Sequence, residues 1–407
     1  MNHEIHETDS PHRCVHLSKT PSTSGRINIS QPLKKSARVY AIDFQTLENL
    51  AYGFSNVWKQ LRCGTALRAA RATSVSNPWK KFMRKLHPLE NIEWLDRLSA
   101  ARGGLSDTLY AMYSGLTNGI TTDPALMNVP VDDHLTHRGD GVFESLKCVD
   151  GQLYNADAHL ARLKLSCAGI GMAPPCPSAE LLEIICDTLR AGGKKTCLIR
   201  VLVSRGTGNM GIDPALCDGP VLYVVAYRLT QRIENGCLKP ARVCVSAIPI
   251  KPRKLATIKA CNYLTNVLMK LEAKERDVDF VISVDENGNL GEGATENIGI
   301  LTADNELLLP TSEHVLAGTT ARRALELAQT LVANGTLAAA ETRDITPEQA
   351  VAAKEIFIFG TTTDCTPVIE WEGSPVGDGT PGPVAAKLLA LLKNDMTPSS
   401  ESLIKVF

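Results

Sequence analysis

The amino-terminal quarter of the chain contains two patterns of polar and apolar positions. Residues 1–37 are rich in Ser, Thr, Pro, His and Lys and show no sustained apolar period, which is typical of disorder. Between residues 43 and 101, apolar residues recur at helical spacing until Gly103-Gly104 interrupts them. We therefore predict an N-terminal extension over residues 1–105 that is disordered at first and then helical.

After residue 105, short runs suited to strands alternate with longer runs of helical period. A hairpin is predicted where Val142–Val149 meets Asp150-Gly151, because Asp-Gly between apolar alternations is a strong turn signal. Further predicted strands are Cys197–Ser204, Pro220–Tyr227, Arg242–Ala247, Val278–Val284, Ile298–Leu301, Glu306–Leu309, Glu355–Phe359 and Pro367–Trp371. Predicted helices are Asn155–Ile170, Ala179–Leu189, a stripe from Leu264 to Leu271, and Thr319–Leu331. This alternation indicates an α/β (α+β) fold class.

A polar stretch divides this α/β part of the chain. Residues 231–239 lack an apolar period and lie between two segments that each contain strands and a helix. We predict a small N-terminal α/β domain at 106–230, an interdomain linker at 231–240, a large domain at 241–397 and a C-terminal tail at 398–407.

The charge of the chain is nearly balanced. The 43 Lys and Arg residues against 44 Asp and Glu residues leave a formal net charge of -1, so no basic field would attract nucleic acid or an anionic membrane. The longest apolar runs, such as Val221–Tyr227, are well short of the roughly 20 residues that cross a bilayer. We therefore expect neither nucleic acid nor membrane among its partners.

Several features are typical of a reduced, cytoplasmic protein. Residues 1–20 contain neither the apolar block of a secretory signal nor an acid-poor amphipathic pattern, so a cytoplasmic location is expected. The 12 cysteines include no Cys-x-x-Cys pair and are predicted to be reduced core residues. His134 and His137 have metal-ligand spacing, but no third ligand cluster accompanies them, so no metal site is predicted.

Side chains suited to one kind of chemistry occur in separate segments. Lys259 lies between the apolar residues Ile258 and Ala260, which would desolvate its amine, lower its pKa and so free it as a nucleophile. The alternative is a surface lysine at the start of a helix. Glu292 lies between two glycines that would let its carboxylate approach a flat ring. Suitable phosphate donors are Arg162, Thr319-Thr320 and the Gly360–Thr363 segment. Together these groups describe a site for pyridoxal phosphate.

The chain resembles the class IV (fold type IV) pyridoxal phosphate-dependent aminotransferases from about Ala111 to Asn394. The motifs that carry this resemblance are His137-Arg-Gly-Asp-Gly-Val-Phe-Glu144, His159-Leu-Ala-Arg-Leu163, Lys259 with Asn262-Tyr263, Glu292-Gly-Ala-Thr-Glu-Asn297, Leu316-Ala-Gly-Thr-Thr-Ala-Arg322 and Gly360-Thr-Thr-Thr-Asp-Cys-Thr-Pro-Val368. The segments Ala111–Ser114 and Val131–His134 are similar to the plant-type branch described as D-amino acid aminotransferase-like or branched-chain-like. The resemblance implies a two-domain fold type IV enzyme whose large domain binds the cofactor.

The resemblance also implies a role for each matching residue. Lys259 would hold pyridoxal 5′-phosphate as an internal aldimine and then move the substrate proton, while Glu292 would pair with the pyridine nitrogen. The remaining implied cofactor-binding residues are Arg162, Thr319, Thr320, Gly360 and Thr361 around the phosphate and Tyr263 at the ring hydroxyl or imine. Candidate substrate-binding residues are Arg138, Arg200 and Thr362.

The implied reaction moves an amino group between a branched-chain or D-amino acid and a 2-oxo acid. The Arg-x-His carboxylate trap of bacterial D-amino acid aminotransferases is absent from Gly208–Ile212, so Arg200 and Arg138 are expected to replace it. An aminodeoxychorismate lyase of the same fold is a less favoured alternative, because such lyases tend to have threonine where Glu144 stands. A non-catalytic cofactor-binding or scaffold protein is the third alternative.

The resemblance also implies a homodimer with active sites near the subunit interface. In this family, loops of the small domain of one chain close the pocket of the other. The apolar strands around Val142–Leu146 and Leu198–Val203 are the surfaces predicted to form this interface.

Overall fold

The computed structural model describes residues 88–311, 315–398 and 400–407. The disorder predicted for residues 1–37, and the helical pattern before residue 88, therefore lie outside the described residues. The end of the predicted extension forms helix α2 (Asn91–Arg102), none of whose side chains is buried. Arg102 Nε donates a hydrogen bond to the Pro124 carbonyl (2.7 Å), which joins α2 to the residues that follow it.

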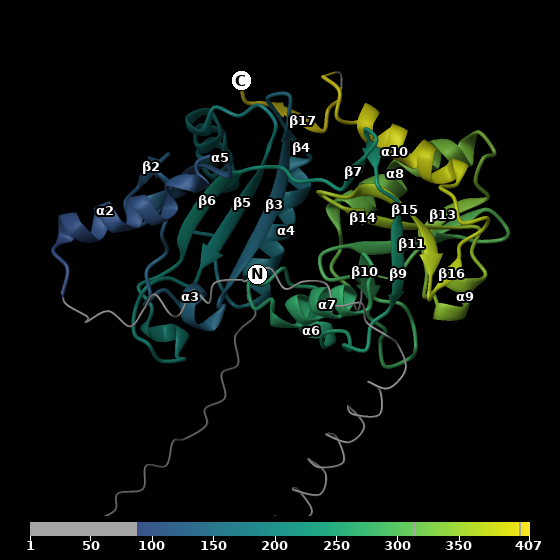
Figure 1. Cartoon of the computed structure of the whole chain (residues 1–407), viewed down its shortest axis with the longest axis horizontal. Coiled ribbons are helices and arrows are strands. Elements are labelled where there is room, and N and C mark those ends of the chain that lie inside the picture. The colour runs from purple at the N-terminus through teal and green to yellow at the C-terminus, as the bar shows by residue number, and fades with distance from the viewer. Residues whose placement is uncertain (1–87, 312–314, 399) are drawn as a thin grey trace, which may run out of the picture. The chain divides into compact units, whose positions relative to one another are not determined.

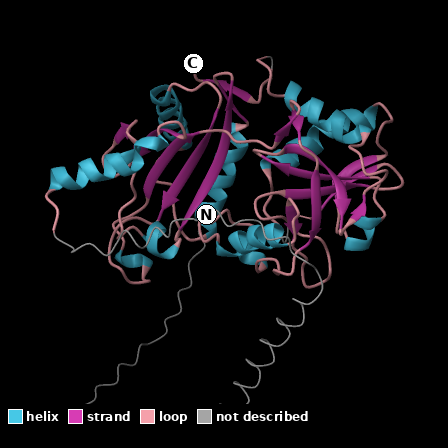
Figure 2. Ribbon diagram, in the orientation of Figure 1, coloured by secondary structure: helices cyan, strands magenta, loops and turns pink. Residues whose placement is uncertain are grey.

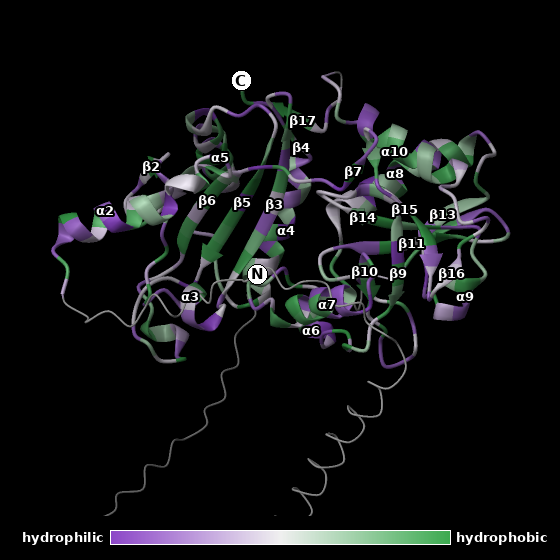
Figure 3. Cartoon of the chain, in the orientation of Figure 1, coloured by the Kyte–Doolittle hydropathy of each residue, from purple (hydrophilic) through white to green (hydrophobic). Residues whose placement is uncertain are grey.

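The first sheet has seven antiparallel strands in the order β17-β4-β3-β5-β6-β1-β2 (Figure 1). Its strands are β1 (Leu109–Ser114), β2 (Gly119–Thr121), β3 (Gly141–Val149), β4 (Gln152–Tyr154), β5 (Cys197–Ser204), β6 (Val221–Tyr227) and β17 (Leu403–Lys405). Helices α4 (Ala156–Gly169) and α5 (Ser178–Gly192) pack on one face and form a common apolar core with it. The short elements η2 (Gly103–Leu105), η3 (Pro124–Leu126), α3 (His134–Arg138) and η4 (Pro214–Leu216) lie in the connections. Figure 3 shows β5 and β6 largely in the hydrophobic colour, as expected for central strands.

The predicted hairpin is confirmed. β3 pairs with β4, and the linking residues Asp150 (φ 49°) and Gly151 (φ 81°) both have left-handed backbones, as a type I′ turn requires. The chain terminus differs from the predicted tail, because β17 pairs with β4 and places the side chain of Phe407 against Gly151. A three-residue strand is too short to produce a period-two signal in the sequence.

The second sheet, whose strands form the right-hand group in Figure 2, has eight strands. Seven of them follow the order β10-β9-β15-β14-β11-β12-β13, and β16 pairs with β15. Its strands are β9 (Ala241–Val245), β10 (Phe280–Ile282), β11 (Asn297–Leu301), β12 (Glu306–Leu309), β13 (Ala339–Thr342), β14 (Glu355–Gly360), β15 (Asp364–Trp371) and β16 (Ser374–Pro375). Its helices are α6 (Arg253–Ala256), α7 (Leu264–Glu275), α8 (Thr319–Ala333), α9 (Pro347–Val351) and α10 (Pro383–Asn394). Between the two sheets, the predicted linker contains the small ribbon β7 (Ile233–Glu234) and β8 (Cys237–Leu238).

Strand β14 separates two apolar cores of the second sheet. Ile356 and Ile358 belong to the core that includes α9, whereas Phe357 and Phe359 belong to the core formed with α8 and α10. Successive side chains of a strand point to opposite faces, so a continuous apolar run is what a strand covered on both sides requires. The strand therefore carries the following turn, Thr361–Thr363, on a rigid support.

The apolar stripe on α7 has an unexpected environment. Leu264, Val267, Leu268 and Leu271 are 70%, 51%, 43% and 48% exposed. The helix instead buries Asn266, Met269 and Ala273 on its opposite side.

The prediction that Val142–Leu146 and Leu198–Val203 form an intersubunit surface is wrong in this structure. Val142, Leu146, Val201 and Val203 are fully buried within the chain, because β3 and β5 are central strands covered by α4 and α5. Among the described residues, no helix is both long and apolar enough to cross a membrane.

Candidate functional site

Lys259 lies in the segment between α6 and α7 and is fixed by its backbone. Its carbonyl accepts a hydrogen bond from the Phe143 amide on β3 (2.9 Å), and its amide donates to Ser166 Oγ on α4 (3.2 Å). Ala260 forms an isolated bridge with Val142 of β3. The first sheet therefore determines where the lysine side chain begins.

The amine of Lys259 is in an apolar and electropositive environment. Its Nζ lies 4.8 Å from the centroid of the Phe143 ring. Burial lowers the pKa of Lys259 to about 8. The positive charges of Arg162 and Arg200 also lower this pKa, whereas the negative charges of Glu144 and Glu292 raise it. At pH 7 an amine with a pKa of about 8 is uncharged in roughly one molecule in ten, far more often than an ordinary lysine, which fits the predicted nucleophile and not a solvated surface lysine.

Glu292 faces the same cavity as Lys259. This cavity is lined by Lys251, Lys259, Tyr263 and Glu292, among others. Burial raises the pKa of Glu292, while Lys251 and a hydrogen bond from the Leu316 amide to Oε2 (3.0 Å) lower it. A buried carboxylate of this kind requires a cationic partner, and a protonated ring nitrogen would supply one.

Tyr263 lines this cavity from the N-terminal end of α7. Its ring meets that of Phe143 edge to face at 5.1 Å, and Lys251 Nζ lies 4.9 Å from its centroid. Burial raises the pKa of Tyr263, so its hydroxyl remains a neutral donor. Lys251 was not among the predicted site residues, since its position in the sequence does not reveal that it faces Glu292.

Arg162 is held by a buried carboxylate. Its Nε and Nη2 donate to Glu144 Oε1 (2.7 Å) and Oε2 (2.8 Å), and its Nη1 donates to the Ala317 carbonyl (2.9 Å). Burial raises the pKa of Glu144, but Arg162 and His159 outweigh this effect and lower it to about 2. Glu144 is therefore ionised at any physiological pH and fixes the direction of the guanidinium.

His159 connects this ion pair to the start of α8. Burial lowers the pKa of His159, so the ring is neutral, and Nδ1 donates to Glu144 Oε2 (2.6 Å). Its Nε2 then accepts from Thr319 Oγ1 (3.2 Å). The roles of Glu144 and His159 were not predicted from the sequence. The signal that could have found them is a Glu on a strand followed by His-x-x-Arg on the next helix.

The start of α8 and the β14–β15 turn provide further hydrogen-bond donors. No side chain of the described residues caps the first turn of α8, so the backbone N–H groups of this turn remain available as donors. Gly318 precedes the turn, and a Cβ at this position would come within 1.8 Å of Asn297 Oδ1. Thr363 Oγ1 is buried without a hydrogen-bond partner in the described part of the chain. A Cβ at Gly360 would approach that hydroxyl to 2.7 Å. Together with Arg162, these unsatisfied groups fit the phosphate of pyridoxal 5′-phosphate.

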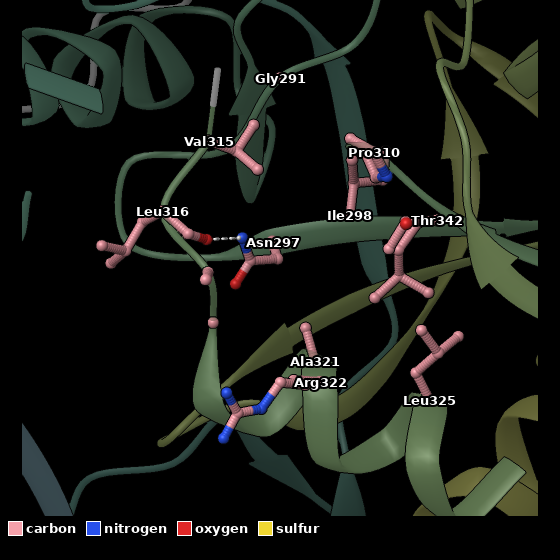
Figure 4. Close-up of a pocket in the computed structure, with 13 residues that line it drawn as sticks. Gly291, Asn297, Ile298, Pro310, Val315, Leu316, Ala321, Arg322, Leu325 and Thr342 are labelled. Carbon is pink, nitrogen blue, oxygen red and sulfur yellow. Dashed lines mark hydrogen bonds between the residues drawn. The ribbon is translucent and has the colours of Figure 1, made fainter. Parts of the chain in front are cut away.

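A second cavity, of about 150 Å³, shares Asn297 and Leu316 with the first (Figure 4). Asn297 Nδ2 donates to the Leu316 carbonyl (3.0 Å) and so fixes the loop whose amide contacts Glu292. The side chains around the second cavity are mostly apolar, so it offers no comparable set of phosphate donors.

Arg200 and Arg138 have different environments. The Arg200 guanidinium lies 4.6 Å from the Phe143 ring centroid and donates from Nη2 to the Tyr227 hydroxyl (3.1 Å), while its buried Nε has no partner among the described residues. Arg138 is exposed, and its Nη2 and Nε donate to the carbonyls of Met210 (2.7 Å) and Gly211 (3.2 Å). Its Nη1 donates to the carbonyl of His137 (2.9 Å). The structure therefore groups Arg200, but not Arg138, with Lys259.

Comparison with known proteins decides the family. The model of the family described as amino-transferase class IV matches residues 141–371, which include both Lys259 and Glu292. The chain belongs to the class IV aminotransferases. It is accordingly a transaminase, and its mixed α/β architecture is that of fold type IV enzymes.

This class IV aminotransferase is similar to relatives named for D-amino acids. It is 37% identical over 311 residues to the D-amino-acid transaminase, chloroplastic, of Arabidopsis thaliana, covering 76% of this chain and 82% of that one. It is 27% identical over 290 residues to the D-alanine aminotransferase of Bacillus licheniformis, covering 69% of this chain and 96% of the relative. Since the Arabidopsis protein is named as chloroplastic, the cytoplasmic location of this chain stays a prediction.

Solved structures agree on the fold. The branched-chain amino acid aminotransferase of Escherichia coli superimposes with a TM-score of 0.66 at 25% identity, covering 74% of this chain and all of that one. The branched-chain amino acid aminotransferase of Thermobaculum terrenum, solved in its PLP-form, has a TM-score of 0.65 at 18% identity and covers 74% of this chain and 99% of that one.

Proposed function

We propose that this class IV aminotransferase uses pyridoxal 5′-phosphate to transfer an amino group between an amino acid and a 2-oxo acid. The observation that carries the proposal is the position of the Lys259 amine, with a pKa lowered to about 8, beside Glu292, Arg162 and Arg200. When bound, the cofactor supplies an electron-withdrawing ring that stabilises negative charge at the reacting carbon. Lys259 Nζ would accept the proton from the substrate carbon and return it.

The remaining site residues would bind and orient the cofactor. A guanidinium has five N–H donors, and the three hydrogen bonds of Arg162 leave two for a phosphate. The other phosphate ligands would come from Thr319, Thr320, Gly360, Thr361 and Thr363, whose Oγ1 has no hydrogen-bond partner among the described residues. Glu292 would hold the ring nitrogen, and the neutral hydroxyl of Tyr263 would bond the ring oxygen.

A D-amino acid is the favoured donor, and a branched-chain amino acid is the second candidate. The Arabidopsis and Bacillus relatives named for D-amino acids support the first, and the Escherichia coli enzyme supports the second. The test is to incubate the purified protein with L- and D-amino acids plus 2-oxoglutarate or pyruvate and to measure the 2-oxo acids formed. Pyruvate release from aminodeoxychorismate without transamination would instead favour a lyase.

Arg200 is proposed to bind the substrate carboxylate, and its substitution should weaken substrate binding selectively. Its Nε has no partner in the part of the chain that the structure describes, and its guanidinium lies over Phe143, so donors remain for a carboxylate. Burial of that carboxylate without a cation would be costly. Arg200→Leu should raise KM for the amino acid by about tenfold or more, while absorbance of the bound cofactor stays unchanged. Arg138→Leu is the control, because its donors bond loop carbonyls. Equal effects of both substitutions would contradict this assignment.

We also propose a homodimer and assign the α7 stripe to its interface. Burial of a Leu or Val side chain stabilises an association by about 1.5–3 kcal/mol, and four such side chains lie exposed along one side of this helix. Leu268→Asp should therefore raise the dimer dissociation constant at least about a hundredfold, measured by sedimentation equilibrium. Val351→Asp, on the exposed side of α9, is the matched control. A wild-type monomer with full activity at micromolar concentration would contradict the dimer.

A further inference from the structure

The turn Thr361–Thr363 is held by contacts from outside its own sheet. Gly360 pairs with Asp364, so three residues connect β14 to β15. Thr361 Oγ1 donates to the carbonyl of Ser145 on β3 (3.3 Å), and Gln231 Nε2 donates to the carbonyl of Thr362 (3.1 Å). Groups from the first sheet and from the segment between the sheets therefore contribute to the position of this turn.

Asp364 terminates the turn in a constrained backbone conformation. Its φ of 49° lies in the left-handed region, where Asp occurs more often than most residues other than glycine. One carboxylate oxygen pairs with Lys147 Nζ of β3, and the other accepts from Gln231 Nε2 (3.0 Å). The side chains of Lys147 and Asp364 are only 4% and 10% exposed. Loss of one charge would leave the other buried and unpaired, so the geometry of the pair is strongly constrained.

Strand β3 contacts both the turn and the reactive lysine. The Phe143 amide bonds the Lys259 carbonyl, the Ser145 carbonyl bonds Thr361, and Lys147 bonds Asp364. These three residues alternate along β3, so their side chains share one face of the strand. The rise of about 3.3 Å per residue then determines the spacing between Lys259 and the turn.

We propose that Lys147, Asp364 and Gln231 form a positioning cluster that sets the distance between the Thr361–Thr363 turn and Lys259. The inference rests on the proposed function, in which Thr361 of this turn binds the cofactor phosphate, and on the predicted role of Thr362 in binding the substrate. The cluster does not itself touch the reacting atoms. The cluster acts through the turn. Lys147 therefore influences the affinity for the cofactor and for the substrate.

The test uses three levels of perturbation in the full chain. Gln231→Leu removes one hydrogen bond to the Thr362 carbonyl of the turn and one to the Asp364 carboxylate, and it leaves the Lys147–Asp364 pair intact. Lys147→Met removes one charge and leaves the Asp364 carboxylate buried and unpaired. The double substitution Lys147→Met/Asp364→Asn removes both charges, so it tests the cluster in a protein that has no buried unpaired charge at this position. The matched control is Glu355→Gln at the opposite end of β14, where the carboxylate accepts from the amides of Val384 (2.9 Å) and Ala385 (2.8 Å).

The first measurement is amide hydrogen exchange of the cofactor-free protein. In Gln231→Leu and the double variant, exchange at residues 361–364 should be about tenfold faster, while that of β11 is unchanged. Glu355→Gln should lower the thermal unfolding midpoint without this local change. Unchanged exchange at the turn in both cluster variants, or equal acceleration in the control, would overturn the proposal.

The second measurement separates binding from chemistry. The dissociation constant of pyridoxal 5′-phosphate and KM for the 2-oxo acid should each rise by about tenfold in the cluster variants, with a smaller change in kcat. A fall in kcat alone would also overturn the proposal. A wild-type protein that neither binds the cofactor nor transaminates would refute the proposed function, while the hydrogen-exchange result for the cluster would stand independently.

Discussion

Lys259→Ala should abolish turnover and covalent cofactor attachment while leaving the fold intact. The amine is placed to act as both nucleophile and proton carrier, and loss of a positioned acid–base group typically costs about 10²–10⁴ in rate. Borohydride reduction followed by peptide mapping should label Lys259 in the wild-type protein. Lys254→Ala, an exposed lysine on α6, is the control and should retain full activity.

The lowered pKa of Lys259 adds a pH dependence to this prediction. Below about 8 the amine is protonated and cannot attack, so attachment of the cofactor to cofactor-free protein should accelerate as pH rises through about 8 and then level off. Stopped-flow absorbance between pH 6 and pH 11 checks this. Labelling of Lys254, or an inflection near the ordinary lysine pKa of about 10.4, would contradict the assignment.

Glu292→Gln should reduce kcat by about 10²–10³ without preventing cofactor binding. The substitution preserves the shape of the side chain but removes the negative charge that would keep the ring nitrogen protonated. The spectrum of the bound cofactor should shift, since its ring nitrogen loses an anionic partner. Glu286→Gln, on the exposed turn after β10, removes an equal charge outside the site and serves as control. A kcat near that of the wild type would place the essential carboxylate elsewhere.

Local elements were predicted well because their causes are local. Strand β5 has the predicted bounds, and the hairpin at Asp150-Gly151 follows from two residues that tolerate a left-handed backbone. β13 and β17 were missed, since strands of four and three residues are defined by the neighbours that pair with them. Helix α10 was not assigned either, although Pro383 at its first turn is a recognised start signal.

The candidate site was predicted by residue type, and its contacts were not. Lys259, Glu292 and Arg162 could be selected from the sequence because each carries chemistry that a cofactor needs. The contribution of Glu144 depends on an ion pair with Arg162 on α4, which is visible only when β3 and α4 are packed together. Arg138 was selected from the sequence as a substrate-binding residue, but the structure shows its guanidinium donating to loop carbonyls.

By itself, the sequence determined the strand and helix periods and the turn chemistry, and it predicted a set of groups able to bind a phosphate and a ring nitrogen. Tertiary structure alone decided which faces are covered. On α7 the sequence pattern favours burial of the Leu264–Leu271 stripe, yet Asn266, Met269 and Ala273 face the protein. Asn266 Nδ2 donates to the Ala294 carbonyl, and the small side chain of Ala273 allows close packing in the core with Val281 of β10. A helix is oriented by the surface it packs against, and that surface comes from residues distant in the sequence.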